Sequence, residues 1–327
     1  MNCSRPDSRS ACRLRRPEPP NLREALQALT RELREGGVES PTVEAERLLS
    51  HVLGIDRTHL ALEGGTALPV EVGKRLAGLV QRRLVGEPLQ HLEGSVAFRT
   101  LELVADTRAL IPRPETEQLI DLICRLVPRN RSRENSVRSV RVIRRPGADR
   151  AAESIPRALD IGTGSGAIAL SLASENIAQF VVGIDISPSA LEQAAENCQR
   201  AGLDARVEFR RSGVDPFSAL KAGDRFGLIV SNPPYIRDDE LASLPAEVRE
   251  CDPPEALSGG TDGLDLVRCI AERAPDFIES SGSLFLEIGA SQATAARRLF
   301  RDVGRWKRVA SHPDLAGHDR FIVAEPL

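Results

Sequence analysis

Aromatic side chains are scarce in this sequence: they make up 3% of its 327 residues, with a single Tyr and a single Trp. A hydrophobic core therefore has to be built from Leu, Val, Ile and Ala. Hydrophobic residues make up 41% of the chain and charged residues 28%, a balance typical of a soluble globular protein. This length favours two domains, or one domain with a sizeable appendage.

Long hydrophobic runs are also absent, and no stretch approaches the length of a transmembrane helix. The first residues are rich in Arg, Ser and Pro, without the apolar centre of a signal peptide. A transit peptide remains an alternative, but Asp7, Glu18 and the prolines favour a disordered tail over residues 1–20. We expect a cytoplasmic protein with no membrane association.

The sequence has no Cys-x-x-Cys pair and no Cys with His at metal-ligand spacing. Scattered cysteines of this kind indicate reduced thiols in a cytosolic protein, so we expect no metal site. The six cysteines are Cys3, Cys12, Cys124, Cys198, Cys251 and Cys269.

An excess of basic charge is absent too, because the net charge is −3. This argues against a protein that wraps a long stretch of nucleic acid, and we expect a monomer without stable nucleic-acid binding. Arginines are concentrated only in residues 129–157, among Ser, Asn, Gly and Pro. A flexible insertion is the preferred interpretation of this segment, and an RNA-contacting arm is the alternative.

Helical periodicity dominates residues 21–85. Apolar residues recur every three or four positions after Asn21, after Ser40-Pro41 and after Pro69, which predicts three helices in a small helical domain. Alternating apolar residues within 86–108 then predict a β-hairpin linker.

Residues 109–327 are predicted to form the catalytic domain. After a first helix and the Arg-rich insertion, short apolar strands alternate with helices from Arg157 onward. This order predicts an α/β fold, a Rossmann-like doubly wound and mainly parallel sheet. Two segments near the C-terminus, Arg308–His312 and Arg320–Ala324, are predicted to pair as an antiparallel hairpin.

A glycine-rich segment, Asp160-Ile161-Gly162-Thr163-Gly164-Ser165-Gly166, lies between a predicted strand and a predicted helix. Glycine permits a tight turn and lets a ligand approach the backbone. The next strand ends in Asp185, 23 residues after Gly162, where an acid can accept hydrogen bonds from two ribose hydroxyls. A helix-capping turn or a nicotinamide site would share this pattern.

S-adenosylmethionine is the cofactor that three features favour. The spacing is Gly-x-Gly-x-Gly, Asp160 is suited to the cofactor's amino group, and a methyltransferase loop follows the fourth strand. Asp215-Pro216-Phe217 follows the third strand, where Asp215 is placed to accept from the adenine amine and Phe217 to stack on the ring. A capping Asp and a core Phe are the alternative for these residues.

The loop that follows the fourth strand is Asn232-Pro233-Pro234-Tyr235. The lone pair of an amide or aromatic amine nitrogen is delocalised, so its methylation needs orientation and polarisation of the NH2 group more than a strong base. The Asn232 oxygen and the Pro233 carbonyl can each accept one N–H, two prolines fix the backbone, and Tyr235 can pack on the planar group. We therefore predict methylation of a planar nitrogen, with all four loop residues catalytic.

The chain resembles the N5-glutamine methyltransferases that modify the Gly-Gly-Gln glutamine of class I peptide chain release factors. The resemblance runs from about Asn21 to the end. It rests on Gly86–Leu92, Leu110–Glu117, Leu159–Ala169, Ser231–Ile236 and Leu286–Gly289, of which the run Ile-Pro-Arg-Pro-Glu-Thr-Glu is the most specific.

The resemblance implies that the helical domain docks the release factor and that the hairpin joins it to the catalytic domain. It also implies that the cofactor is held at Gly162 to Gly166, Asp185 and Asn232, with the glutamine on Asn232 to Tyr235. Arg113, Pro114 and Glu117 match the family pattern beside the active site. The chain departs from the family in its tail, in its long basic insertion and in Pro216, where an aromatic is usual.

Three other functions stay open at this stage. A relative that methylates a ribosomal-protein glutamine shares the fold and the loop, although Ile111–Glu117 favours the release factor. An adenine-N6 nucleic-acid methyltransferase also uses this loop but needs a basic recognition domain. A non-catalytic module that binds the ribosome or a translation factor would not need both the cofactor turn and the loop.

Overall fold

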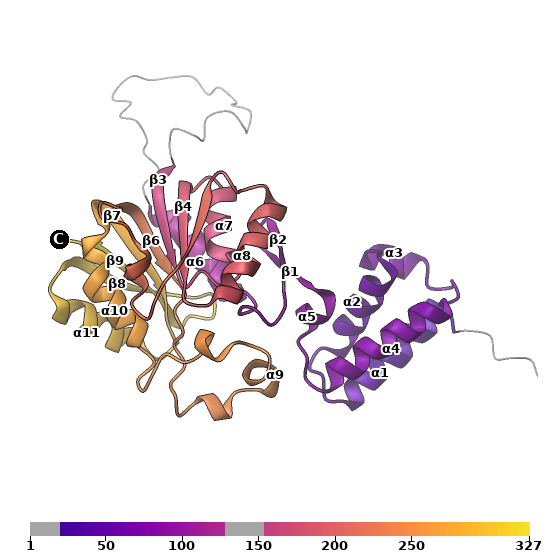
Figure 1. Ribbon diagram of the computed structural model, residues 1–327. Helices are drawn as coiled ribbons and strands as arrows, with labels where there is room; N and C mark the ends of the chain where they lie inside the picture. The colour runs from indigo at the N-terminus through magenta and orange to yellow at the C-terminus, as the bar shows by residue number, and fades with distance from the viewer. Residues whose placement is uncertain (1–19, 128–153) are drawn as a thin grey trace, which may run out of the picture. The chain divides into compact units, whose positions relative to one another are not determined.

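The computed structural model describes residues 20–127 and 154–327, and the chain divides into two compact units (Figure 1). The first unit ends at Leu92 and the second begins at Glu93. Each unit has its own hydrophobic core. The predicted tail, apart from Pro20, and the predicted insertion as far as residue 153 lie outside the described residues.

The first unit is helical, and its core is formed mainly by Leu. Asn21 caps its first helix in a capping box: its side chain accepts from the Glu24 N–H, while the Glu24 carboxylate accepts from the Asn21 N–H. The helices are α1 (Leu22–Glu35), α2 (Pro41–Leu53), α3 (Arg57–Leu62), α4 (Val70–Leu84) and α5 (Leu89–Glu93).

Two short helices in this region differ from the sequence predictions. The helix α3 is new, and α5 occupies residues that were predicted to open the hairpin linker. Six and five residues are too few to show a helical period, so neither helix had a readable signal. Val43 belongs to the apolar periodicity that predicts a helix after Ser40-Pro41, but its side chain is exposed.

The predicted hairpin is confirmed as β1 (Ser95–Phe98) and β2 (Leu101–Val104), which pair antiparallel. It belongs to the second unit, where Phe98 and Leu103 are buried in the core. The Val104 N–H donates to the Asn197 side chain and the Val104 carbonyl accepts from Gln193. The hairpin is therefore fixed to the helix that carries Asn197.

The second unit is built on a seven-stranded sheet in the order β5-β4-β3-β6-β7-β9-β8. Strands β3 to β7 run parallel, β9 is antiparallel to β7, and β8 is antiparallel to β9. The strands are β3 (Ile155–Ile161), β4 (Ala178–Asp185), β5 (Val207–Arg211), β6 (Phe226–Ser231), β7 (Ile278–Glu287), β8 (Trp306–Pro313) and β9 (Asp319–Pro326).

Helices cover both faces of this sheet (Figure 1), which confirms the predicted doubly wound fold. Neighbouring residues of one strand enter different cores: Ala158 packs with α6, α7 and α8, and Leu159 with α10 and α11. The α-helices of this unit are α6 (Pro114–Leu126), α7 (Ala167–Ser174), α8 (Pro188–Ala201), α9 (Ala246–Arg249), α10 (Asp265–Arg273) and α11 (Ala293–Val303), and its 3-10 turns are Pro216–Ala219, Leu241–Ser243, Pro254–Ala256 and Ala274–Asp276.

Strand β3 begins earlier than predicted. Residues 155–157, assigned from the sequence to the Arg-rich insertion, already pair with β4, and the Ile155 N–H donates to the Ile177 carbonyl. Pro156 and Arg157 obscured the strand signal, since proline is tolerated only where it has no ladder bond to donate. The predicted C-terminal hairpin is confirmed, and its second strand, β9, is inserted between β7 and β8.

Candidate active site

The glycine-rich turn leaves the carboxyl end of β3, at the point where the strand order of the sheet reverses. This is where open α/β sheets bind ligands. Gly162 and Gly164 have φ values of +70° and +54°, which L side chains rarely adopt, and both line a pocket. No atom lies within 4 Å of a Cβ added to either residue, so the turn leaves open space for a ligand.

Asp160 supports this turn from inside the protein. Its carboxylate accepts from the Thr163 hydroxyl at 2.6 Å and from the Ala169 N–H at 3.1 Å. The side chain is fully buried, and burial raises its pKa to about 7. Asp160 and Thr163 are not among the residues that line the pocket, so the structure gives them a supporting position rather than a place in its wall.

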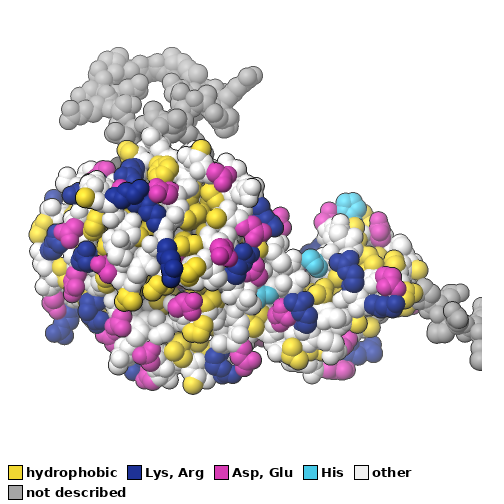
Figure 2. All heavy atoms as spheres, viewed as in Figure 1, with side chains coloured by type: hydrophobic (Ala, Val, Ile, Leu, Met, Phe, Trp, Pro, Cys, Tyr) yellow, Lys and Arg dark blue, Asp and Glu magenta, His cyan; other side chains and the backbone are white. Residues whose placement is uncertain are grey.

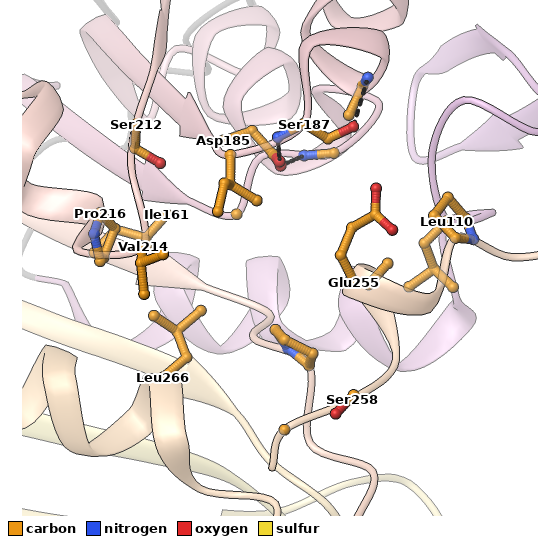
Figure 3. Close-up of a pocket in the computed structure, with 18 of the residues that line it drawn as sticks. Leu110, Ile161, Asp185, Ser187, Ser212, Val214, Pro216, Glu255, Ser258 and Leu266 are labelled. Atoms are coloured by element: carbon orange, nitrogen blue, oxygen red, sulfur yellow. Dashed lines mark hydrogen bonds between the residues drawn. The ribbon is translucent and has the colours of Figure 1, made fainter. Parts of the chain in front are cut away.

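Asp185 lies at the carboxyl end of β4 and lines the pocket (Figure 3). One carboxylate oxygen accepts from the Gly164 N–H at 2.8 Å and the other from the Ser187 N–H at 2.9 Å. An ionised carboxylate has about four acceptor sites, so both oxygens can still accept from ligand hydroxyls. Burial is the main cause of the raised pKa of Asp185.

The pocket has a volume of about 590 Å³. Val214, Pro216 and Leu266 lie on one side of it, and Leu110 and Glu255 on the other (Figure 3). The first group offers apolar surface to a flat ring, while Asp185 and Glu255 offer acceptors. Of the predicted cofactor residues, the pocket wall contains Gly162, Gly164, Asp185, Asp215, Pro216 and Asn232.

The segment Asp215-Pro216-Phe217 is divided between the pocket and the core. Asp215 lines the pocket, but it also caps the following turn through the Phe217 N–H and forms an ion pair with Arg273 at 2.6 Å. Phe217 is buried and stacks on Phe277, with ring centroids 5.3 Å apart. The predicted adenine stacking by Phe217 is therefore replaced by a core role, because its ring packs beneath the sheet face instead of lining the pocket.

Ser165 and Gly166 also stand back from the pocket. Ser165 is buried, and its carbonyl accepts from the Asn197 side chain. Gly166, with φ +83°, is the N-cap of α7, and a Cβ there would lie 3.3 Å from Ala194 and Leu170. The absence of a side chain at Gly166 allows α7 to pack closely on its neighbours.

Asn232 follows β6 directly and lines the same pocket. Ser231, just before it, donates to the Ile161 carbonyl at 2.6 Å and so joins the ends of β6 and β3. The Asn232 side-chain NH2 donates to the Thr116 hydroxyl at 3.1 Å, and that hydroxyl donates to Glu287 at 2.8 Å. The structure thus brings the predicted catalytic Asn beside the predicted cofactor turn.

The rest of the catalytic loop is held by backbone contacts. The Tyr235 carbonyl accepts from the Gln292 side chain at 2.9 Å, and Ile236 pairs with residues Leu257 and Gly259. Pro234 lines the pocket, whereas Pro233 and Tyr235 do not. Burial raises the pKa of Tyr235, and the Arg320 guanidinium lies 5.9 Å from its ring.

Comparisons with known proteins agree with this arrangement. Residues 24–94 match the model of the PrmC N-terminal domain, and residues 153–261 match a methyltransferase domain. The release factor glutamine methyltransferase of Deinococcus radiodurans is 37% identical over 93% of this chain and 98% of its own length. That of Cereibacter sphaeroides is 38% identical over 92% and 97%.

The chain belongs to the release factor glutamine methyltransferase family. Among solved structures, it is similar to a methyltransferase from Pyrococcus furiosus, with 20% identity and a TM-score of 0.39 over 52% of this chain and 74% of that one. A second is TrmN from Thermus thermophilus, with 20% identity and a TM-score of 0.37 over 53% of this chain and 44% of that one.

The release factor glutamine methyltransferase motif at Ile111–Glu117 has contacts that the sequence did not reveal. Arg113 pairs with Asp252 at 2.8 Å, which ties the start of α6 to the segment after the catalytic loop. Glu117, which matches the family pattern beside the active site, accepts from the Arg99 N–H in the hairpin turn. The contact with Asn232 comes from Thr116, which was not singled out.

Glu255 and Glu287 are two of the acidic residues that the sequence prediction missed, and Asp238 and Asp265, which also line the pocket, are two more. Glu255 lines the pocket and follows Pro253-Pro254, while Glu287 lies in the matched segment Leu286–Gly289. That segment was the available signal for Glu287, since an acid at the end of a buried apolar strand needs a partner.

Among the residues that the structure describes, neither a cluster of metal ligands nor a membrane-spanning helix accompanies this pocket. Within residues 20–127 and 154–327, no group of three or more His, Cys, Asp or Glu side chains is placed to hold a metal ion. In the same residues, none of the helices combines the length and the apolar character needed to cross a bilayer. Basic and acidic side chains alternate over the visible surface of the second unit (Figure 2).

Proposed function

We propose that this methyltransferase transfers the methyl group of S-adenosylmethionine to the N5 amide nitrogen of the glutamine in the Gly-Gly-Gln motif of class I release factors. The observation that carries the proposal is the position of Asn232. It lines the same pocket as Gly162, Gly164 and Asp185, so one cavity joins a nucleotide-binding turn to an acceptor for an NH2 group. Family membership supports the choice of substrate.

The pocket residues fit S-adenosylmethionine. Asp185 supplies acceptors for the two ribose hydroxyls, Gly162 and Gly164 leave room along the turn, and Val214 and Leu266 offer apolar surface to the adenine. When bound, the cofactor supplies an electrophilic methyl group on a sulfonium. Asp215 and Pro216 remain candidates for the adenine edge, and Glu255 is a candidate for the cofactor's polar groups.

The catalytic loop orients the substrate nitrogen. The Asn232 oxygen and the Pro233 carbonyl each accept one N–H of the glutamine amide, which turns the nitrogen lone pair towards the methyl group. These acceptors bind more strongly as positive charge develops on the nitrogen. With the cofactor bound, the nitrogen would gain the methyl group that the sulfonium loses, and would then release one proton to water. Tyr235 packs on the amide plane.

The first unit is proposed to dock the release factor. We assign docking to residues 21–85, the linker to residues 86–108 and catalysis to residues 109–327. We propose further that the enzyme acts as a cytoplasmic monomer without stable nucleic-acid binding. The net charge of −3 supports the last point, because nucleic-acid binders usually carry an excess of basic charge.

Methyl transfer from labelled S-adenosylmethionine to purified release factor tests the proposal. Wild-type release factor should be labelled, whereas a factor with glutamate in place of the Gly-Gly-Gln glutamine should not. Equal labelling of both would exclude this glutamine as the target. Label in a ribosomal protein or in DNA adenine, offered in parallel, would establish one of the other substrates instead.

A further inference from the structure

Two family motifs meet at Asn232 through side chains that the catalytic account has not used. Thr116 belongs to the first turn of α6, and Glu287 ends β7. They are 171 residues apart in sequence, yet Thr116 Oγ1 and Glu287 Oε2 are 2.8 Å apart. Asn232 Nδ2 lies 3.1 Å from the same hydroxyl. The three side chains form a hydrogen-bonded chain that ends in the pocket.

The carboxylate sets the direction of every bond in this chain. An ionised Glu287 can only accept, so the Thr116 hydroxyl must donate to it. The hydroxyl has one proton, and its oxygen is therefore left as an acceptor towards Asn232. Only the NH2 end of the Asn232 amide can satisfy that acceptor, so the amide oxygen points away from Thr116.

We propose that Thr116 and Glu287 are positioning residues that hold the Asn232 amide with its oxygen, rather than its NH2 group, towards the substrate nitrogen. This inference rests on the proposed function, because an NH2 substrate needs an acceptor. A flipped Asn232 would place its own NH2 group against the NH2 group of the glutamine, and two donors cannot bind each other, so the glutamine would not be oriented. The relay thus selects one of two amide orientations that have nearly the same shape.

The surroundings of Glu287 make the relay sensitive to pH. Burial raises the pKa of Glu287 to about 7, and the charge of Glu115 adds to this effect. Arg320 on β9, Arg113 at the start of α6 and the hydrogen bond from Thr116 oppose it. Tyr235 also faces this carboxyl, which contributes to the raised pKa of the Tyr235 phenol.

Protonation of Glu287 allows the chain to reverse. A carboxylic acid can donate to the Thr116 oxygen, which frees the Thr116 proton for the Asn232 oxygen. Asn232 can then turn its NH2 group towards the pocket. Activity that depends on the relay is therefore present above the pKa of Glu287 and is lost as the pH falls through about 7.

Three variants of the full-length enzyme separate positioning from structure. Thr116→Val keeps the shape but removes the hydroxyl, Thr116→Ser restores it, and Glu287→Gln removes the charge. Ser171→Ala is the matched control, because Ser171 is an equally buried hydroxyl on α7 without a hydrogen-bond partner in the described residues. All four are compared with wild type for kcat against pH and for S-adenosylmethionine affinity.

We expect Thr116→Val to lower kcat roughly ten- to hundredfold, since misorientation of one catalytic group costs about this much. The affinity of Thr116→Val for S-adenosylmethionine should stay within about twofold of wild type, because this substitution affects turnover and not cofactor binding. Thr116→Ser and Ser171→Ala should retain kcat and the pH profile. Glu287→Gln should lower kcat and flatten the acidic limb. The pKa of Asp160 is also raised to about 7, so this variant is needed to assign the acidic limb to Glu287.

The side-chain amide of Asn232 gives a readout that does not depend on turnover. In 15N-labelled enzyme its NH2 resonances should shift with pH near 7, and the shift should vanish in Glu287→Gln and in Thr116→Val. A Thr116→Val enzyme with normal kcat, or Asn232 resonances that ignore pH in wild type, would overturn the relay. An enzyme that labels no release factor but retains this titration would contradict the proposed function alone.

Discussion

Asn232 is the residue on which the proposed chemistry depends most. Its side chain lines the pocket, while its NH2 group is already bonded to Thr116. The Asn232→Ala variant should therefore lose about 10²–10³-fold in kcat, the usual cost of removing one preorganised polar group. Labelled methyl transfer measures this loss, and circular dichroism checks that the fold is kept. Near-normal turnover would exclude the acceptor role.

Asp160 makes a residue-scale prediction about stability. Its pKa of about 7 lies above the ordinary value of 3.8, so the folded state binds this proton more tightly than the unfolded chain does. The stabilisation of the folded state by this bound proton is present below the ordinary pKa of Asp160 and is lost as the pH rises towards 7. Relative to Asp160→Asn, the wild-type free energy of unfolding should fall by up to about 1.4 kcal/mol per pH unit in this window.

Urea unfolding followed by fluorescence measures this difference. Trp306, the single Trp of the chain, is buried in the second unit and therefore reports on the unit that contains Asp160. An identical pH dependence for the two proteins would show that Asp160 keeps an ordinary pKa.

Single residues were predictable from sequence where one short segment carries the whole signal. Asp185 ends an apolar strand, Asn232 directly follows one, and both line the pocket. Thr116 and Glu287 were not assigned roles, because their contact joins positions 171 residues apart. Phe217 was misplaced because a side chain after a strand can face either the pocket or the core.

Cofactor binding by the glycine-rich turn depends on the backbone conformation of the turn. Gly164→Ala places a Cβ at a φ of +54° on the pocket wall, beside the Asp185 carboxylate that its N–H binds. Strain of about 1–2 kcal/mol is expected. Affinity for S-adenosylmethionine should fall at least about tenfold, the equivalent of 1.4 kcal/mol, by calorimetry.

Gly202→Ala is the matched control for this change. Gly202 caps α8 with a φ of +66°, has no atom within 4 Å of an added Cβ, and lies away from the pocket lining. It should lose similar stability without losing cofactor affinity. Equal affinity losses in both variants would mean that strain, rather than the pocket wall, explains the effect.

Helices of several turns and complete apolar strands were predictable from the sequence, and shorter elements were not. Helices α1, α2 and α4 carry clear apolar periods, whereas α3 and α5 have too few residues to show one. The position of β9 between β7 and β8 is set by pairing between distant strands. A periodic pattern identifies a strand but does not choose its neighbours.

At the scale of the whole molecule, the two units have separate cores. The catalytic unit from Glu93 should therefore fold alone and bind S-adenosylmethionine with unchanged affinity. Methylation of the release factor should fall at least about tenfold through a raised KM, because docking by the first unit is lost. Calorimetry and labelled transfer measure the two properties. Undiminished methylation by this fragment would remove the docking role.

The central claim is that one glutamine of a release factor receives the methyl group. Mass spectrometry of peptides from a release factor treated with this enzyme and S-adenosylmethionine tests it most directly. We predict one added methyl group on the side-chain nitrogen of the Gly-Gly-Gln glutamine, and far less of it after the same treatment with Asn232→Ala. A methyl group on another residue, or an unmodified glutamine after complete reaction, would contradict the account.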